Sequence, residues 1–229
     1  KTNVKIISQK NKGLGGARNT GIKNALGKYV LFLDADDWYL HNTLKDLISI
    51  ANDNELDILE FAAQGIFPNG EIAYHSKNST LKIMDGLTYY NNVRYLHSAC
   101  NKIYNRNFID QNKLFFCEKI FIEDFEFNTR AFSTAHRVQA TDLLVAQFLQ
   151  SPNSITRSSN VSNRMKIVND LLVVLQKTKQ AYVDHRHINS DLAYHFFNER
   201  LTFLNLNIFY QLFKNKASFE EMSNIKKQL

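Results

Sequence analysis

The sequence predicts an α/β protein with a mostly parallel sheet flanked by helices, followed by an α-helical C-terminal extension. Apolar runs of strand length alternate with segments of helical spacing over the first 150 residues or so. The run at residues 29–34 is apolar up to its last residue, as in a strand buried on both faces. After about residue 160 the periodicity is helical and no proline occurs. We therefore expect an α/β domain at residues 1–158 and a helical region at 159–229.

The first elements form a strand, helix and strand. Residues 4–9 have the composition of a short strand, residues 17–27 place small and apolar residues at helical spacing, and residues 29–34 are the next strand. This order is the unit of a parallel sheet with right-handed crossovers. Later elements are predicted as a helix at 43–54, a strand at 56–67, a turn at 67–70, helices at 85–96 and 127–135, a strand-rich segment at 137–150, and helices at 164–185 and 190–215.

Composition narrows the class of protein. The chain carries two cysteines without metal-site spacing, so neither a disulfide framework nor a structural zinc site is supported, and a cytoplasmic location fits. The net charge of +6 suits nucleic acid, an anionic membrane surface or a phosphorylated ligand. No combined aromatic and basic signature favours nucleic acid. No apolar run is long enough to cross a bilayer.

Three carboxylates follow the strand at residues 29–34: Asp34, Asp36 and Asp37. Ligands of open α/β sheets bind beyond the carboxyl ends of the strands, which makes this a candidate site. Crowded carboxylates need a cation or a proton, and Mg²⁺ or Mn²⁺ shared with phosphate oxygens satisfies that need. The alternative is that Asp36 and Asp37 form a solvated turn that caps a helix beginning near His41.

The stretch NKGLGGARNTGIKNALGKYVLFLDADD resembles the signature of family 2 glycosyltransferases, which are inverting enzymes of the Rossmann-like GT-A fold. Its usual form is N-x-G-x-x-x-A-R-N-x-G, then A-x-G, then an apolar strand ending in DxDD. The matching positions are Asn11, Gly13, Ala17, Arg18, Asn19, Gly21, Ala25, Gly27, Asp34, Asp36 and Asp37. Farther on, Glu123, Asp124 and Phe127 match the E-D-x-x-F motif of the acceptor side. The resemblance covers residues 3–158.

The resemblance implies roles for the two acidic clusters. Asp36 is expected to be the principal ligand of Mn²⁺ or Mg²⁺, with Asp34 as a second ligand or a ribose contact. Asp124 is expected to be the general base and Glu123 to orient it or the acceptor, although these two roles are exchangeable. Without the resemblance, favourable charges at the positive end of a helix explain both acids better than catalysis does.

Four further residues are candidates for substrate binding or for structure. Arg18 and Asn19 are expected near the donor or the loop that carries the aspartates, but Arg18 is equally explained as a structural partner of an aspartate. Lys102 is a candidate acceptor contact, with a solvated lysine as the alternative. Arg157 is a candidate for a positive charge that the family often has after its last strand.

The implied reaction is transfer of a sugar, with inversion, from a nucleotide-diphosphate donor, a UDP-sugar, to a hydroxyl of a saccharide or lipid-linked acceptor in polysaccharide or glycoconjugate biosynthesis. The family begins with a P-V-Y-N-like stretch and a D-G-S-x-D motif, and neither occurs here. We therefore expect a fragment that lacks its first strand–helix–strand unit and has an incomplete donor pocket. The alternative is a noncatalytic binding or oligomerisation module of the same fold.

The C-terminal helices carry many aromatic side chains, for which the plainest expectation is that they cover the α/β domain. Two alternatives are a peripheral contact with the inner face of the cell membrane and a homodimer formed through these helices. The aromatic residues are Phe196, Phe197, Phe203, Phe209, Tyr210 and Phe213.

Overall fold

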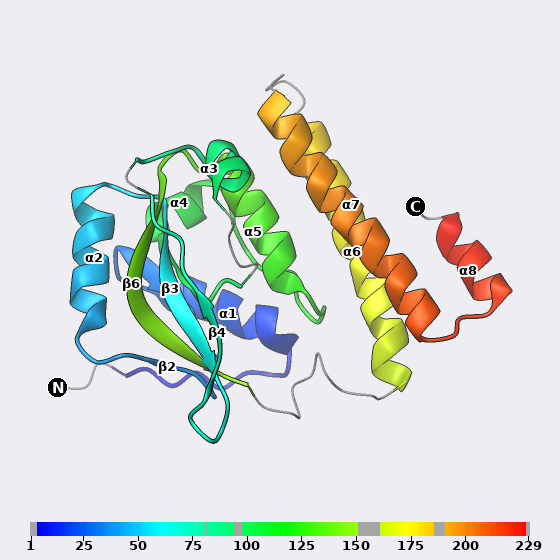
Figure 1. Ribbon diagram of the computed structural model, residues 1–229, viewed down its shortest axis with the longest axis horizontal. Coiled ribbons are helices and arrows are strands. Elements are labelled where there is room, and N and C mark those ends of the chain that lie inside the picture. Colours follow the sequence, from blue (N-terminus) through cyan, green and yellow to red (C-terminus); the bar gives the residue numbers. More distant parts are fainter. Residues whose placement is uncertain (1–3, 81, 94–97, 151–160, 186–190, 228–229) are drawn as a thin grey trace.

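The computed structural model describes residues 4–80, 82–93, 98–150, 161–185 and 191–227. A curved sheet has helix α2 (Thr43–Asp53) on one side and α5 (Glu123–Thr134) on the other, and a long helical pair lies beyond α5 (Figure 1). The strands are β1 Tyr29–Leu31, β2 Trp38–Tyr39, β3 Ile58–Ile66, β4 Ile72–Ser76, β5 Lys102–Asn105 and β6 Val138–Leu149. The remaining helices are α1 Gly13–Asn24, α3 Gly86–Asn92, α4 Arg106–Gln111, α6 Val161–Asp184, α7 Asp191–Lys214 and α8 Phe219–Lys226.

The sheet is mixed, so the prediction of a mostly parallel sheet is wrong for the described residues. The strand order is β1-β5-β3-β6-β2, with β4 also paired to β3. Only β3 and β6 pair in parallel among the described strands. Strand β5 lies between β1 and β3 and is antiparallel to both. Strands β1 and β3 therefore run in the same direction, although they are not paired with each other. The β3–β4 hairpin turns at residues 67–70 as predicted, where the Gly70 N–H donates to Phe67 O at 2.9 Å.

The N-terminal strand prediction is wrong. Residues 4–10 form no strand, and the side chains of Val4 and Ile6 are 76% and 92% exposed. A strand requires a neighbour for its backbone hydrogen bonds, and no described strand lies beside this segment. The strand predicted at residues 29–34 is reduced to the three residues of β1 at the sheet edge, where Val30 is buried and its two neighbours are only partly buried. It is not buried on both faces.

The long periodic segments are confirmed. The predicted helices at 43–54, 127–135, 164–185 and 190–215 correspond to α2, α5, α6 and α7, and the predicted strands at 56–67 and 137–150 to β3 and β6. The helix predicted at 85–96 is α3, although residues 94–97 lie outside the described residues. None of the helices in the described part of the chain combines the length and apolar character that a membrane span requires.

Two hydrophobic clusters hold the molecule together. In the first, Phe116 stacks on Phe127 of α5 with ring centroids 3.9 Å apart, and Phe196 and Phe197 of α7 are fully buried in the same cluster. The second joins Phe125 of α5 to α6 and α7. Phe196 and Phe197 thus cover the α/β part as predicted, but the prediction is wrong for the other aromatic side chains of α7, which are 43–85% exposed: Phe203, Phe209, Tyr210 and Phe213. The predicted domain boundary at residue 158 lies outside the described residues.

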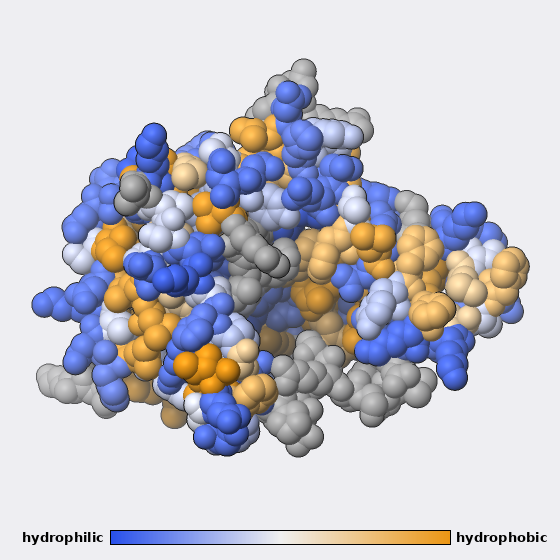
Figure 2. Space-filling view, in the orientation of Figure 1, coloured by the Kyte–Doolittle hydropathy of each residue, from blue (hydrophilic) through white to orange (hydrophobic). Residues whose placement is uncertain are grey.

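Part of the helical surface stays open. Figure 2 shows apolar side chains on the surface of the C-terminal helices. In this region Leu206 is 65% exposed, and Phe213 and Phe219 are each 85% exposed. The predicted membrane contact and homodimer both concern this surface, and both stay predictions.

Candidate active site

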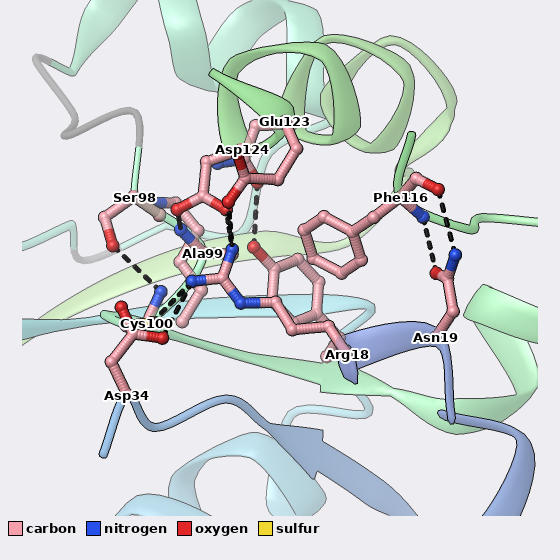
Figure 3. A network of polar contacts seen from close by, with 12 residues as sticks. Arg18, Asn19, Asp34, Ser98, Ala99, Cys100, Phe116, Glu123 and Asp124 are labelled. Carbon is pink, nitrogen blue, oxygen red and sulfur yellow. Dashed lines mark hydrogen bonds and ion pairs between the residues drawn. The ribbon is translucent and has the colours of Figure 1, made fainter. Parts of the chain in front are cut away.

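Arg18 of α1 joins the two acidic clusters. Its Nη2 lies 3.0 Å from Asp34 Oδ1, which follows β1, while its Nη1 lies 3.0 Å from Glu123 Oε1 and also binds Asp124 Oδ1 at the start of α5 (Figure 3). The Arg18 side chain is only 6% exposed. Folding therefore brings together residues that are more than 100 positions apart in the sequence.

The electrostatics of this cluster leave an excess of negative charge. The pKa of Glu123 is raised to about 7, because burial and, next, the Asp124 carboxylate outweigh the lowering effect of Arg18. Burial also raises the pKa of Asp124, against the lowering effect of Arg18. The guanidinium loses hydration, yet its acidic neighbours, with Asp124 foremost, raise its pKa overall. One guanidinium cannot neutralise three carboxylates, so the cluster has capacity for a proton or another cation.

Both oxygens of Asp124 are held in place. Oδ1 accepts from Arg18, and Oδ2 accepts from the backbone N–H of Ala99 at 2.9 Å. Helix α5 begins at Glu123, so both acids lie in its first turn, where the positive end of the helix dipole favours them. The carboxylate is thus oriented while lone pairs remain to accept a substrate hydroxyl.

The aspartates after β1 differ in their surroundings. Asp37 Oδ1 accepts from the Leu149 N–H at 2.9 Å, which ties this segment to the end of β6. Burial raises the pKa of Asp37 to about 6, and the nearby Asp36 adds to the effect. Asp36 is exposed. The alternative of a solvated turn that caps the next helix is right in its first part, since residues 35–36 form a turn in which the Asp37 N–H donates to Asp34 O at 3.1 Å. Its second part is wrong, because the N-cap of α2 is Asn42.

Asn19 and Lys102, two further predicted substrate residues, hydrogen-bond to backbone carbonyl groups and make no direct contact with the carboxylates of this cluster that is described. Asn19 donates to Phe116 O at 2.9 Å and accepts from Phe116 N at 2.7 Å, which fixes the backbone after α4 (Figure 3). Lys102 is fully buried, so the alternative of a solvated lysine is wrong. Its Nζ donates to Ser98 O at 2.8 Å and lies 3.6 Å from Glu60 Oε2. Arg157 lies outside the described residues.

A comparison with known families now decides the class of protein. The model of the family described as Glycosyl transferase family 2 matches residues 1–122, more than half of the chain. The chain belongs to glycosyl transferase family 2.

Similar proteins agree with this assignment. The uncharacterized glycosyltransferase EpsJ of Bacillus subtilis (strain 168) is 30% identical over 160 residues, which cover 67% of this chain and 46% of EpsJ. The poly(ribitol-phosphate) β-N-acetylglucosaminyltransferase TarS of Staphylococcus aureus (strain MW2) is 28% identical over 141 residues, covering 60% of this chain and 24% of TarS. The chain spans about half the length of EpsJ.

The fold is that of a solved family member. The crystal structure of S. aureus TarS residues 1–349 in complex with UDP-GlcNAc superposes with a TM-score of 0.66 at 21% sequence identity. The match covers 97% of this chain and 62% of the TarS chain. The mixed, curled sheet and the C-terminal helices are therefore those of the TarS fold.

The candidate site borders a cavity of about 600 Å³ beside Glu123. Its walls are largely apolar, and two lysines, Lys119 and Lys166, also line it. The Lys166 ammonium is already bound to Asp170. The apolar residues that line the cavity are Leu14, Ile120, Phe121 and Ile122.

Asp34 and Asp36 are the candidate ligands of a divalent metal. Among the described residues, no group of three or more His, Cys, Asp or Glu side chains is arranged to hold a metal ion. Two carboxylates suffice for Mg²⁺ or Mn²⁺ when waters and diphosphate oxygens complete the octahedron. Asp34 is about one-third exposed and Asp36 is exposed, so both are accessible to such a complex. The donor set fits these hard cations.

Two contributors to the site were missed from the sequence. Ala99 acts through its backbone N–H, for which a side-chain motif gives no signal. Cys100, whose Sγ lies 3.5 Å from Arg18 Nη2, offered no motif either. Glu60 did offer a signal, because a lone carboxylate interrupts the apolar run of β3.

Proposed function

We propose that this family 2 chain carries out inverting transfer of a sugar from a nucleoside-diphosphate donor, a UDP-sugar, to a hydroxyl of an acceptor in polysaccharide or glycoconjugate biosynthesis. The observation that carries the proposal is the shared guanidinium of Arg18, which binds Asp34 on the donor side and Asp124 on the acceptor side. TarS, which has the same fold, is a β-N-acetylglucosaminyltransferase crystallised with UDP-GlcNAc.

The acceptor side supplies the base. In-line attack on the anomeric carbon requires a carboxylate that takes the proton of the acceptor hydroxyl. Asp124 is our choice, because Arg18 and Ala99 fix its orientation and burial makes it a stronger base than a solvated aspartate. Glu123 lines the cavity and orients the acceptor. With a pKa of about 7, Glu123 is also the alternative base.

The donor side supplies charge stabilisation. Asp36 and Asp34 would hold Mn²⁺ or Mg²⁺, and such an ion supplies Lewis-acid stabilisation of the departing diphosphate. Arg18 keeps Asp34 oriented toward the acid cluster.

The cavity beside Glu123 supports an amphiphilic acceptor. Its apolar walls would accommodate the apolar part of a lipid-linked saccharide, whereas a fully polar saccharide would leave them uncovered. We place the reaction in the cytoplasm, at the inner face of the cell membrane.

The alternative function, a noncatalytic oligomerisation module, is favoured by the exposed apolar residues of α7 and α8, such as Phe213 and Phe219. Nucleotide binding distinguishes it from a transferase.

The test is calorimetric titration of UDP into the protein with and without Mn²⁺. We expect metal-dependent binding that Asp36→Ala weakens at least tenfold, while Asp142→Ala, an exposed aspartate on β6, leaves it unchanged. Where UDP binds, UDP-GlcNAc and a lipid-linked acceptor then test for transfer, with the anomeric configuration of the product read by NMR. Absence of UDP binding both by this chain and by the chain extended with a first strand–helix–strand unit of the family would contradict the proposed donor site, and so would equal binding by Asp36→Ala.

A further inference from the structure

The peptide unit between Ser98 and Ala99 is hydrogen-bonded to Lys102 at one end and to Asp124 at the other. Lys102 Nζ donates to the carbonyl oxygen of Ser98 at 2.8 Å, and the next amide along the chain, Ala99 N–H, donates to Asp124 Oδ2 at 2.9 Å. The carbonyl and the N–H belong to the same planar trans peptide unit, so they point in opposite directions. The ammonium and the carboxylate therefore lie at the two ends of one peptide dipole.

The Lys102 charge is buried at some cost. Its side chain is 0% exposed and that of its partner Glu60 is 1% exposed. Lys102 Nζ also donates to Asn101 Oδ1 at 2.7 Å, and Glu60 Oε1 accepts from Asn78 at 2.7 Å. Apolar residues of similar volume commonly replace a buried ion pair without loss of stability. A contribution to stability is therefore not a sufficient reason for this buried pair. The contact between Lys102 and the Ser98 carbonyl gives another reason for it.

We propose that Lys102 is a positioning residue that orients and polarises the Ser98–Ala99 peptide, so that the Ala99 N–H holds Asp124 in its reactive geometry. The chain of donors runs from the ammonium through the peptide to the carboxylate, and each hydrogen bond in such a chain strengthens the next. The Cys100 N–H, which donates to Ser98 Oγ at 3.0 Å, closes the same turn. The proposal rests on the proposed function only in the use that it assigns to Asp124.

Several charges face Asp124 from the elements around it. Arg18 on α1 binds Oδ1, Glu123 precedes it on α5, and Asp34 after β1 acts through space. Cys100, with a thiol whose pKa burial raises to about 12, is neutral near pH 7. Among the described residues, the Ala99 N–H is the hydrogen-bond donor to Asp124 Oδ2, whereas Arg18 binds Oδ1. The hydrogen bond to Oδ2 can therefore be weakened while the Arg18 contact is left in place.

The test compares two variants with the wild-type chain. Lys102→Met alone would strand the Glu60 carboxylate, so the informative change is the double variant Glu60→Gln/Lys102→Met, which keeps the net charge and removes the whole pair. Glu60→Gln alone is the comparison variant, because it keeps the Lys102 side chain beside the Ser98 carbonyl. It leaves the buried Lys102 without its carboxylate partner, so its results count only where circular dichroism and urea denaturation show a folded protein. The pKa of Asp124 is followed by ¹³C NMR of its carboxyl carbon, assigned with Asp124→Asn, and the Ala99 hydrogen bond by its amide proton shift.

We expect the double variant to stay folded, to raise the pKa of Asp124 by about one unit and to move the Ala99 amide proton upfield, because a weaker donor stabilises the carboxylate less. The comparison variant should leave the Ala99 proton in place and the pKa of Asp124 unchanged or lower. A folded double variant with both signals unchanged would overturn the proposal. So would loss of fold in the double variant, which would make the pair structural.

The titration requires no substrate, so it separates this inference from the proposed function. If the pKa of Asp124 shifts as expected but the protein binds no nucleotide, even when extended by a first strand–helix–strand unit of the family, the role of Lys102 would be supported and the transferase function refuted. In a protein that transfers sugar, the acid limb of the pH profile of kcat should move to higher pH by the same amount as the pKa of Asp124, with KM unchanged. If the double variant transfers sugar with the acid limb of its kcat profile at the same pH as in the wild-type chain, only the proposed role of Lys102 would be contradicted.

Discussion

Glu123 is a carboxyl group that the fold keeps largely away from water, with its side chain only 9% exposed. Burial raises its pKa to about 7, whereas an unfolded glutamate titrates near 4.5. Between these values the native state holds a proton that the unfolded state has released. The free energy of unfolding contributed by this group therefore falls as the pH rises from about 4.5 to about 7, and the full cost of the charged form is present above that.

We expect Glu123→Gln to flatten this pH dependence. The wild-type chain should lose roughly 2–3 kcal/mol of unfolding free energy through Glu123 between pH 4.5 and 8, and the variant should not. Asp37, with a pKa of about 6, acts with the same sign in both proteins and cancels in the difference. Urea denaturation at pH 4.5, 6 and 8 measures the effect, with the exposed Glu118→Gln as control. The prediction would be refuted if the unfolding free energy changed with pH by the same amount in the wild-type chain and in both variants.

Helix α1 approaches the segment after α4 through a glycine. A Cβ at Gly15 would lie 2.2 Å from the carbonyl oxygen of Cys117, whereas a Cβ at Gly21, on the same helix, would have no atom within 4 Å. The backbone contact at Gly15 sets how closely α1, and with it Arg18, lies against the start of α5.

Two alanine substitutions on α1 should therefore have opposite effects. Gly15→Ala forces the helix away from Cys117 and should cost about 1–3 kcal/mol, as other overpacked sites do. Gly21→Ala removes chain entropy at an open position and should stabilise by about 0.5–1 kcal/mol. Urea denaturation of both variants measures this. Equal changes in unfolding free energy for the two variants would show that the backbone contact between Gly15 and Cys117 can widen at little cost.

Long elements were predictable because a periodic apolar pattern over ten or more residues is local information. The direction of β5 was not, because it depends on pairing with β1 and β3 across the sheet. Motif matching placed Arg18, Asp34 and Asp124 in one site. It could not place Lys102, whose burial depends on Glu60 from another strand.

The C-terminal helices support the acidic end of α5 from two sides. Arg200 of α7 is 1% exposed, stacks 3.9 Å from the Phe125 ring centroid, and donates to Thr129 Oγ1 at 2.6 Å and to Phe125 O at 2.9 Å. Asp170 of α6 accepts from the Phe121 N–H at 2.8 Å, just before α5 begins. Helices far along the chain thus fix the turn that carries Glu123.

Arg200→Met should loosen this support in the whole molecule. The substitution keeps much of the volume but leaves the Thr129 and Phe125 oxygens without their charged donor, so we expect a loss of about 2–4 kcal/mol. Limited proteolysis should then cut the helical region faster than in the wild-type chain. Lys214→Met, an exposed change on the same helix, is the control. Equal stability of the two variants would mean that the helices dock without Arg200.

The shared guanidinium of Arg18 has a consequence for how such proteins diversify. Because Asp34 and Asp124 compete for one partner, a substitution at either carboxylate changes the charge balance felt by the other. Paired substitutions there should be strongly non-additive. If Asp34 and Asp124 have the donor-side and acceptor-side roles proposed above, lineages that acquire a new sugar donor through changes near Asp34 would have to readjust acceptor chemistry at Asp124, and the two specificities would evolve together.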